Sequence, residues 1–294
     1  MTQPTTPPVR SRLDPLHQIT ASVQRWHDTT CSSGMDELVL EEPLEVRVCG
    51  QDGACETLAV IMRTPGRDDE LAAGFLLSEG LVAGRGEIAA LRPGSDPDGL
   101  PSDNVLDVLP APEVDLLARL RAGGYSRRFA VNSSCGVCGT NTVAAACAAL
   151  PPLPPDAFAV APDVLYVLPD RLRAGQRVFA STGGLHAAAL FDATGALLAL
   201  REDVGRHNAV DKLVGRAMLD DTLPLNERIL LVSGRLSFEI VLKALAARIP
   251  IVAAVSAPSS LAVDLAQSGG VTLAAFLRGS SVNLYTYPER VRAL

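Results

Sequence analysis

The sequence predicts an α/β protein, with a larger C-terminal domain following a smaller N-terminal α/β domain. Three short aliphatic segments read as strands: Arg228–Val232, Ile251–Val255 and Val271–Leu277. Two segments of helical periodicity, Ser237–Ala247 and Ser259–Gln267, separate them. Strands that are apolar along their whole length and alternate with helices are typical of a parallel sheet covered on both faces.

The smaller domain is expected at residues 30–125, after a tail at residues 1–29 that is rich in Pro and Thr and contributes little to the fold. Alternating apolar and charged residues predict strands, and clusters of Gly, Pro, Asp and Ser predict turns and loops. The expected elements are a strand at Leu44–Val48, a turn at Gly50–Gly53, a strand at Thr57–Met62, a helix from about Arg67 to Leu81, an exposed loop at 93–104 and a strand at Val105–Leu109.

The larger domain is expected at residues 156–294. A cysteine-containing loop, a helix and a Pro-rich linker at residues 126–155 precede it. Its own elements begin with a helix at Val164–Ala180, a strand hairpin at 186–201 and a helix from Gly205. The order helix, two strands, then alternating helices and strands is that of a cytidine deaminase-like α/β/α sandwich. The order of the strands within the sheet is not visible in the sequence.

Composition excludes several classes of protein. The 294 residues carry a net charge of −7, which argues against a broad surface for DNA or RNA. No segment approaches the roughly 20 apolar residues needed to cross a bilayer, and the N-terminus has no apolar core of a secretory signal. We therefore expect a soluble protein in the cytoplasm that binds neither nucleic acid nor membrane.

The cysteines Cys135 and Cys138 form the one cysteine motif, within CGVCG. Two thiols three residues apart can face the same direction, and the flanking glycines let a large partner approach closely. A helix expected at 140–150 would place Cys138 near its N-terminus, where a thiolate is favoured. The other cysteines, Cys31, Cys49, Cys55 and Cys147, are interpreted as scattered packing residues.

Other interpretations of this motif fit less well. Structural zinc needs four ligands, and the chain has no second pair of this spacing. A thioredoxin-like motif is expected in a βαβ unit near the chain start rather than at mid-chain. Inert core cysteines do not suit the polar surroundings. Zinc-dependent base deamination needs H-x-E and P-C-x-x-C, but neither His186 nor His207 begins H-x-E, and Ser134 precedes Cys135. We expect no metal site.

Two groups of polar residues occur in the larger domain. TGGLH at 182–186 contains Thr182, Gly183, Gly184 and His186, and REDVGRHNAVDK at 201–212 contains His207. On a helix, Asp203 and Asp211 would each lie four residues from His207 and could orient its imidazole. A capped amphipathic helix with a satisfied histidine explains the spacing equally well, so the density of polar residues decides for a functional site.

Polar residues also follow the parallel strands. Ser233, Gly234 and Arg235 follow one strand, Ser256 follows the next, and FLRGSS at 276–281 ends the last. In open parallel sheets, ligands bind beyond the carboxyl ends of the strands, where helix N-termini attract anions. Arg235 and Arg278 can add bidentate contacts to phosphate. These loops predict a pocket for a phosphorylated or nucleotide-containing ligand.

Taken together, these motifs resemble the FdhD family of sulfur carriers over about residues 40–290. The blocks that carry the resemblance are RTPGRDDELAAGFLLSEGL (63–81), SSCGVCG (133–139), TGGLHAAAL (182–190), REDVGRHNAVDK (201–212), SGRLSFE (233–239), SAPSSLAVDLA (256–266) and FLRG (276–279).

The resemblance implies a sulfurtransferase that works as a homodimer. It would take persulfide sulfur from a cysteine desulfurase and pass it to the molybdenum bis(molybdopterin guanine dinucleotide) cofactor before the cofactor enters formate dehydrogenase. Cys135 would carry the persulfide, with Cys138 as its partner. A cofactor-binding chaperone without sulfur chemistry is the alternative. The expected cofactor-binding residues are Phe276, Leu277, Arg278, Gly279, Ser280, Ser281, Ser233, Gly234, Arg235, Ser256, Thr182, Gly183, Gly184, His186 and His207.

Overall fold

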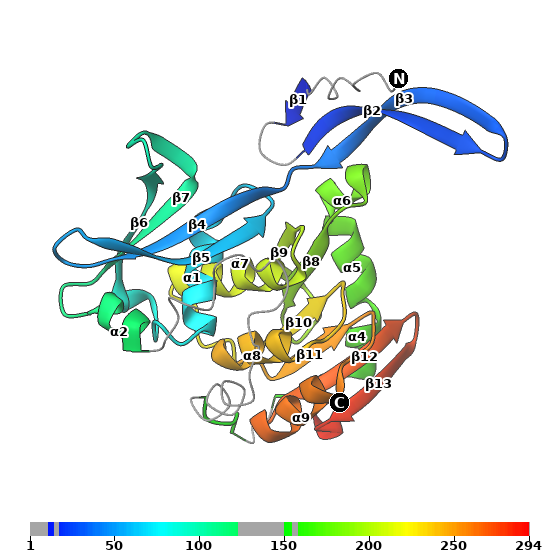
Figure 1. Cartoon of the computed structure of the whole chain (residues 1–294). Helices are drawn as coiled ribbons and strands as arrows, with labels where there is room; N and C mark the ends of the chain where they lie inside the picture. The colour runs from blue at the N-terminus through cyan, green and yellow to red at the C-terminus, as the bar shows by residue number, and fades with distance from the viewer. Residues whose placement is uncertain (1–10, 15–17, 123–149, 155–157, 294) are drawn as a thin grey trace.

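The computed structural model describes residues 11–14, 18–122, 150–154 and 158–293. Figure 1 shows a six-stranded sheet covered by helices, a four-stranded sheet beside it, and a small three-stranded sheet that projects from both. No helix in the described ranges is long and apolar enough to cross a membrane.

The six-stranded sheet has the order β13-β12-β11-β10-β8-β9. β10, β11 and β12 are parallel, as predicted, while β8, β9 and β13 are each antiparallel to their neighbours. β13 was not predicted. The strands are β8 (His186–Phe191), β9 (Leu197–Asp203), β10 (Ile229–Val232), β11 (Ile251–Ala254), β12 (Thr272–Arg278) and β13 (Ser281–Thr286).

Helices cover both faces of this sheet, so the predicted α/β/α sandwich is confirmed. On one face, α7 (Arg206–Leu219), α8 (Phe238–Ala246) and α9 (Ser260–Gly269) share a core with Leu230 and Val252. On the other face, α4 (Pro162–Tyr166) and α5 (Leu168–Gly175) pack on Leu231 and Ala253. A short 3-10 helix at Pro288–Arg290 lies near the C-terminus.

The single helix expected at Val164–Ala180 is wrong, because this segment forms α4, α5 and a third short helix, α6 (Arg177–Thr182). Pro169 has no N–H to donate to the preceding turn, so a helix cannot run through it unbroken. The Glu202 carboxylate then starts α6 afresh, accepting hydrogen bonds from the backbone N–H groups of Val178 (3.1 Å) and Phe179 (2.8 Å).

The four-stranded sheet has the order β5-β4-β7-β6. The loop expected at residues 93–104 is wrong, since β6 and β7 run into it and leave only a short turn. The Asp96 carboxylate closes that turn by accepting the N–H groups of Asp98 (3.0 Å) and Leu100 (2.9 Å). The elements are β4 (Glu42–Cys49), β5 (Cys55–Arg63), α1 (Asp68–Ser78), a 3-10 helix at Arg85–Glu87, β6 (Ile88–Ser95), β7 (Pro101–Pro110) and α2 (Leu116–Ala122).

The tail expected at residues 1–29 is also structured in part. β1 (Ser11–Asp14), β2 (Gln18–His27) and β3 (Thr30–Val39) form the projecting sheet, with residues 1–10 outside the described ranges. Asp28 takes a φ of +54°, which suits the tight turn between β2 and β3. The Pro and Thr that predicted a tail are concentrated ahead of β2, whose own sequence is compatible with a strand.

The cysteines differ from the packing role expected of them. Cys49 and Cys55 face each other across the β4–β5 hairpin and form a disulfide, because the turn between them brings the two strand ends together. Cys31 is exposed on β3. Cys147 lies outside the described residues, as does the helix expected at 140–150.

Candidate functional site

The carboxyl ends of β10, β11 and β12 form one edge of the sandwich, and the predicted strand-end residues lie along it. Ser233 follows β10 and binds the start of β8 twice. Its backbone N–H donates to the Ala187 carbonyl (2.9 Å), and its Oγ accepts from the Ala187 N–H (2.9 Å). His186 is therefore placed beside Ser233 and Gly234.

Backbone hydrogen bonds join the three strand-end segments into a continuous edge. The Leu236 N–H donates to the Ala257 carbonyl (3.1 Å), and the Phe276 N–H donates to the Ser256 carbonyl (3.1 Å). Arg278 reaches back to the Val255 carbonyl with Nε at 3.5 Å. The segments containing Ser233 to Arg235, Ser256 and Phe276 to Ser281 thus lie together, although they are well separated in sequence.

The end of β12 and the turn into β13 have unusual backbone geometry. Phe276 lies in β12 where its register with β13 shifts, and it has a φ of +54°, which a residue with a Cβ adopts only at a cost of about 1–3 kcal/mol. The residue is nevertheless 36% exposed. Gly279 takes a φ of +52° in the turn that follows, where glycine carries no such cost. Strain that presents an aromatic ring to solvent is more typical of a ligand-contacting residue than of a packing one.

The residues Thr182, Gly183 and Gly184 connect α6 to β8. Gly183 ends the helix with a φ of +68°, and the Thr182 hydroxyl donates to the Val178 carbonyl (2.8 Å). A Cβ on Gly184 would lie 2.9 Å from Val39 of the projecting sheet. These three residues therefore shape the path of the chain into His186.

His207 lies at the start of α7, but its partners are not the two aspartates that helical spacing predicted. Its Nε2 lies 2.7 Å from Glu239 Oε2 and 3.0 Å from Ser237 Oγ, both at the start of α8. The imidazole is thus held between two helix N-termini by a carboxylate. Helical spacing along one helix could not reveal partners that come from its neighbour.

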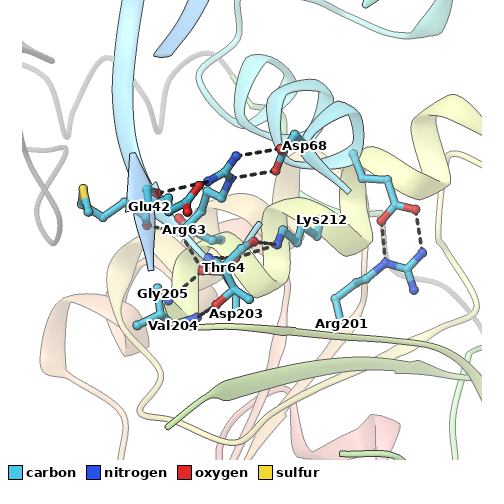
Figure 2. A network of polar contacts seen from close by, with 12 residues as sticks. Glu42, Arg63, Thr64, Asp68, Arg201, Asp203, Val204, Gly205 and Lys212 are labelled. Atoms are coloured by element: carbon cyan, nitrogen blue, oxygen red, sulfur yellow. Dashed lines mark hydrogen bonds and ion pairs between the residues drawn. The ribbon is translucent and has the colours of Figure 1, made fainter. Parts of the chain in front are cut away.

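Asp203 is fully buried. It lies where the four-stranded sheet meets the sandwich, in the polar network that Figure 2 shows. Its Oδ2 pairs with Lys212 Nζ at 2.7 Å and accepts the Thr64 N–H at 3.2 Å. Lys212 also donates to the Thr64 carbonyl at 2.9 Å. Asn208 donates to Asp203 Oδ1 and to the Met62 carbonyl, both at 2.8 Å. These motif residues hold the end of β5 against the sandwich.

Asp211 has a similar buried role. Lys243 of α8 donates to both of its carboxylate oxygens, at 2.7 and 2.9 Å, and the Ser78 hydroxyl of α1 lies 3.1 Å from Oδ1. Nearby, burial raises the pKa of the Glu79 carboxyl. The REDVGRHNAVDK motif therefore divides between buried anchors and the residues that reach the edge.

Arg206 is an edge residue that was not among the expected site residues. Its Nε is buried without a hydrogen-bond partner among the described residues. Gly234 lies between Arg206 and His186, since a Cβ added there would be 3.5 Å from Arg206 Cδ and from His186 Nδ1. Burial, followed by the charges of Arg206 and His207, lowers the pKa of His186. A guanidinium with an unused donor suits an anionic ligand.

Three helices begin at this edge, with N-caps at Gly205, Ser237 and Ser259. Free N–H groups and helix dipoles at such positions favour anions. Ser259 uses its own Oγ to accept the Ala262 N–H at 3.3 Å. Sequence reasoning missed Ser237 and Glu239 as partners of His207, although both belong to the SGRLSFE block.

Cys135 and Cys138 lie outside the described residues. Among the described side chains, potential metal ligands gather in a group of three at Cys49, Cys55 and Asp107, in the four-stranded sheet. His186 and His207 belong to no such group within the described part of the chain.

Comparisons with known proteins place the chain in a family. The sequence model of the FdhD/NarQ family matches residues 39–292. A Streptomyces coelicolor protein named sulfur carrier protein FdhD is 51% identical over 273 residues, covering 92% of this chain and 94% of the relative. A Mycobacterium tuberculosis protein of the same name is 50% identical, covering 87% and 92% of the two chains.

A solved structure agrees in fold. The crystal structure of a Desulfotalea psychrophila protein, provisionally described as a formate dehydrogenase accessory protein, matches with a TM-score of 0.71 and 22% sequence identity. The match covers 94% of this chain and all of that one. From the family match and the close relatives together, the chain belongs to the FdhD/NarQ family.

Proposed function

We propose that the protein is a sulfur carrier that accepts persulfide sulfur from a cysteine desulfurase and transfers it to the molybdenum bis(molybdopterin guanine dinucleotide) cofactor. The sulfurated cofactor then enters formate dehydrogenase. The observation that carries the proposal is that the chain belongs to the FdhD/NarQ family. About half of its residues are identical to those of proteins named sulfur carriers. The CGVCG motif, with Cys135 and Cys138, supplies the thiols that such a carrier needs.

The strand-end edge supports the cofactor part of the proposal. Bis(guanine dinucleotide) groups bring several phosphates and two purine rings. Arg206 has an unused buried donor, and three helix N-termini open onto the same edge. Phe276 offers an exposed ring at its end. These residues suit an anionic ligand with aromatic parts, and this ligand is the substrate of the carrier rather than its resident cofactor.

In the proposed loading step, the Cys135 thiolate attacks the terminal sulfur of the desulfurase persulfide. The desulfurase cysteine leaves as a thiolate, and Cys135 carries the sulfur as a persulfide. Cys138 is the proposed partner that later attacks this persulfide and releases the sulfur, leaving a disulfide. We also propose that the protein works as a homodimer.

Intact-mass spectrometry tests the proposal. The protein is incubated with an active cysteine desulfurase and cysteine, beside a Cys135→Ala variant and a matched Cys31→Ala variant at the exposed cysteine of β3. We expect wild type and Cys31→Ala to gain the mass of sulfur in a form that a thiol reductant removes, and Cys135→Ala to gain none.

Wild-type protein that gains no sulfur from an active desulfurase would contradict the carrier. That result would favour the alternative, a chaperone that binds the cofactor without sulfur chemistry. Such a chaperone would still need the strand-end edge, whereas it would tolerate loss of Cys135.

A further inference from the structure

We infer that Cys49, Cys55 and Asp107 form a redox-gated binding site for a single thiophilic divalent cation such as Zn²⁺. The site lies in the four-stranded sheet and is independent of the CGVCG motif and of the proposed sulfur transfer. In the disulfide state the two sulfurs are bonded to each other. In the dithiol state they can bind a cation together with the Asp107 carboxylate.

The backbone holds the three ligands together in either redox state. Cys49 ends β4 and is paired in register with Cys55 at the start of β5. The Gly50 N–H donates to the Ala54 carbonyl at 2.7 Å and closes the turn between them. Asp107 comes from β7 on the other side of β4. One ligand atom from each of the three residues lies within 4.8 Å of the other two.

The spacing and chemistry of these atoms suit zinc. Tetrahedral bonds of about 2.3 Å to sulfur and 2.0–2.2 Å to oxygen place ligand atoms roughly 3.5–3.8 Å apart, which needs only small side-chain movements in this cluster. Two thiolates favour Zn²⁺ over Mg²⁺ or Ca²⁺, which prefer oxygen ligands. Three protein ligands would leave a fourth position for water.

The surroundings hold the carboxylate in place. Arg47 binds Asp107 Oδ1 with both Nε and Nη2 at 2.8 Å, which leaves the second oxygen of Asp107 as a ligand. Arg92 is paired with Asp107 in register on the neighbouring strand β6. Cys49 and Asp107 are only 2% and 7% exposed. Carboxylates that bind metal ions are generally hydrogen-bonded through outer partners, and Arg47 would be that partner here.

The two states interconvert by balanced steps. Binding converts two thiols and Zn²⁺ into a zinc dithiolate and two protons. Oxidation by a small-molecule disulfide converts the zinc dithiolate and two protons into the Cys49–Cys55 disulfide, free Zn²⁺ and two molecules of small thiol. The two electrons leave the cysteine sulfurs and break the S–S bond of the oxidant. Oxidation therefore releases the cation.

The test uses the full chain with Cys135 and Cys138 changed to serine, so that the other thiol pair cannot contribute. This protein is titrated with Co²⁺, and with Zn²⁺ in competition, first as the dithiol and then as the Cys49–Cys55 disulfide. We expect one cation per chain and a thiolate-to-cobalt absorption band in the dithiol state, and neither in the disulfide state. Bound Zn²⁺ should also protect both cysteines from alkylation.

Two further variants in that background identify the ligands. Cys49→Ser with Cys55→Ser should abolish the band, and Asp107→Asn should weaken binding by at least about 10- to 100-fold, since loss of even an outer partner of a metal ligand costs that much. Cys31→Ser is the matched control and should bind as before. No band in the dithiol protein, or a band that survives loss of Cys49 and Cys55, would overturn the site. Comparing two redox states of one sequence keeps this test valid if a variant misfolds.

Discussion

At the scale of single residues, the most informative contrast is within the helix α7 motif. Asp203 and Lys212 are turned into the junction between the two sheets, whereas Arg206 and His207 reach the strand-end edge. All four occur close together in sequence, and nothing in their types separates them. Their places in the fold decide, because Asp203 ends β9 and Lys212 is buried along α7, whereas Arg206 and His207 begin that helix at the edge.

The charge of Arg206 should add to the effect of burial on the protonation of His186. A nearby cation disfavours the imidazolium, so Arg206→Gln should raise the pKa of His186, which burial and Arg206 now lower. NMR titration of the imidazole protons measures this. Arg235→Gln is the control, because Arg235 is not among the groups that shift this histidine. An unchanged His186 pKa in Arg206→Gln would show that the guanidinium points elsewhere.

The same shift has a consequence for stability. Because the folded-state pKa of His186 lies below the ordinary value of 6.5, the unfolded chain binds more protons near and below that pH. This residue therefore lowers the stability of the fold as pH falls through 6.5. Urea unfolding above and below that pH measures this effect. The free energy of unfolding should fall less at the lower pH for Arg206→Gln than for wild type.

At the scale of elements, the contact between α1 and α7 depends on two glycines. A Cβ on Gly74 would lie 1.9 Å from the Asp211 carbonyl oxygen, and one on Gly215 would lie 1.8 Å from the Glu70 carbonyl oxygen. Each glycine thus lets one helix backbone rest on the other. Neither side can yield to an added methyl group without moving a helix.

Gly74→Ala and Gly215→Ala should each lower the free energy of unfolding by about 1–3 kcal/mol or more, the usual cost of overpacking. Chemical denaturation followed by circular dichroism measures the loss. Gly86→Ala provides the control, since a Cβ there meets nothing within 4 Å. Equal stability of the three variants would mean that the helices separate easily.

The sequence predicted the elements of the sandwich better than those around it. Apolar strands such as Ile229–Val232 carry their own signal, because both faces of the sheet are covered. β13 was missed because its side chains alternate between exposed and partly buried, as on an edge strand. The helix expected at Val164–Ala180 was wrong because Pro169 interrupts it. The full lengths of β6 and β7 were missed because the polar composition of residues 93–104 looked like a long loop, although only a short turn separates the two strands.

The sequence allowed us to predict which loops of the candidate site lie together, but not which side chains contact one another there. Loops after parallel strands meet at one edge by topology, so Ser233, Ser256 and Phe276 could be grouped from the sequence. The pairing of His207 with Glu239 joins two helices and depends on how they pack. The Cys49–Cys55 disulfide likewise required the register of the β4–β5 hairpin.

At the scale of the whole molecule, the two sheets share one core. Buried residues of β4, α1, α7 and β10, such as Val46, Leu71, Leu213 and Leu230, belong to a single cluster. The family match begins at residue 39, at the end of β3, so the projecting sheet is set apart from the shared body. The body should therefore unfold as one cooperative unit.

Lys212→Met tests this coupling. Lys212 is 2% exposed and neutralises Asp203 at 2.7 Å, while its bond to the Thr64 carbonyl ties the smaller sheet to the sandwich. Its loss leaves a carboxylate buried without its cation, which costs about 3–5 kcal/mol. Differential scanning calorimetry should show one transition at a lower temperature.

The matched control is Arg216→Met, on the exposed side of the same helix. Arg216 pairs with Asp220, and both side chains are about half exposed (43% and 55%), so its loss should cost less than about 1 kcal/mol. If Lys212→Met instead splits the melting curve into two transitions, the Asp203–Lys212–Thr64 network holds together two bodies that fold separately. A single shifted transition means that the shared core already makes them one, and that the network adds stability without defining the unit.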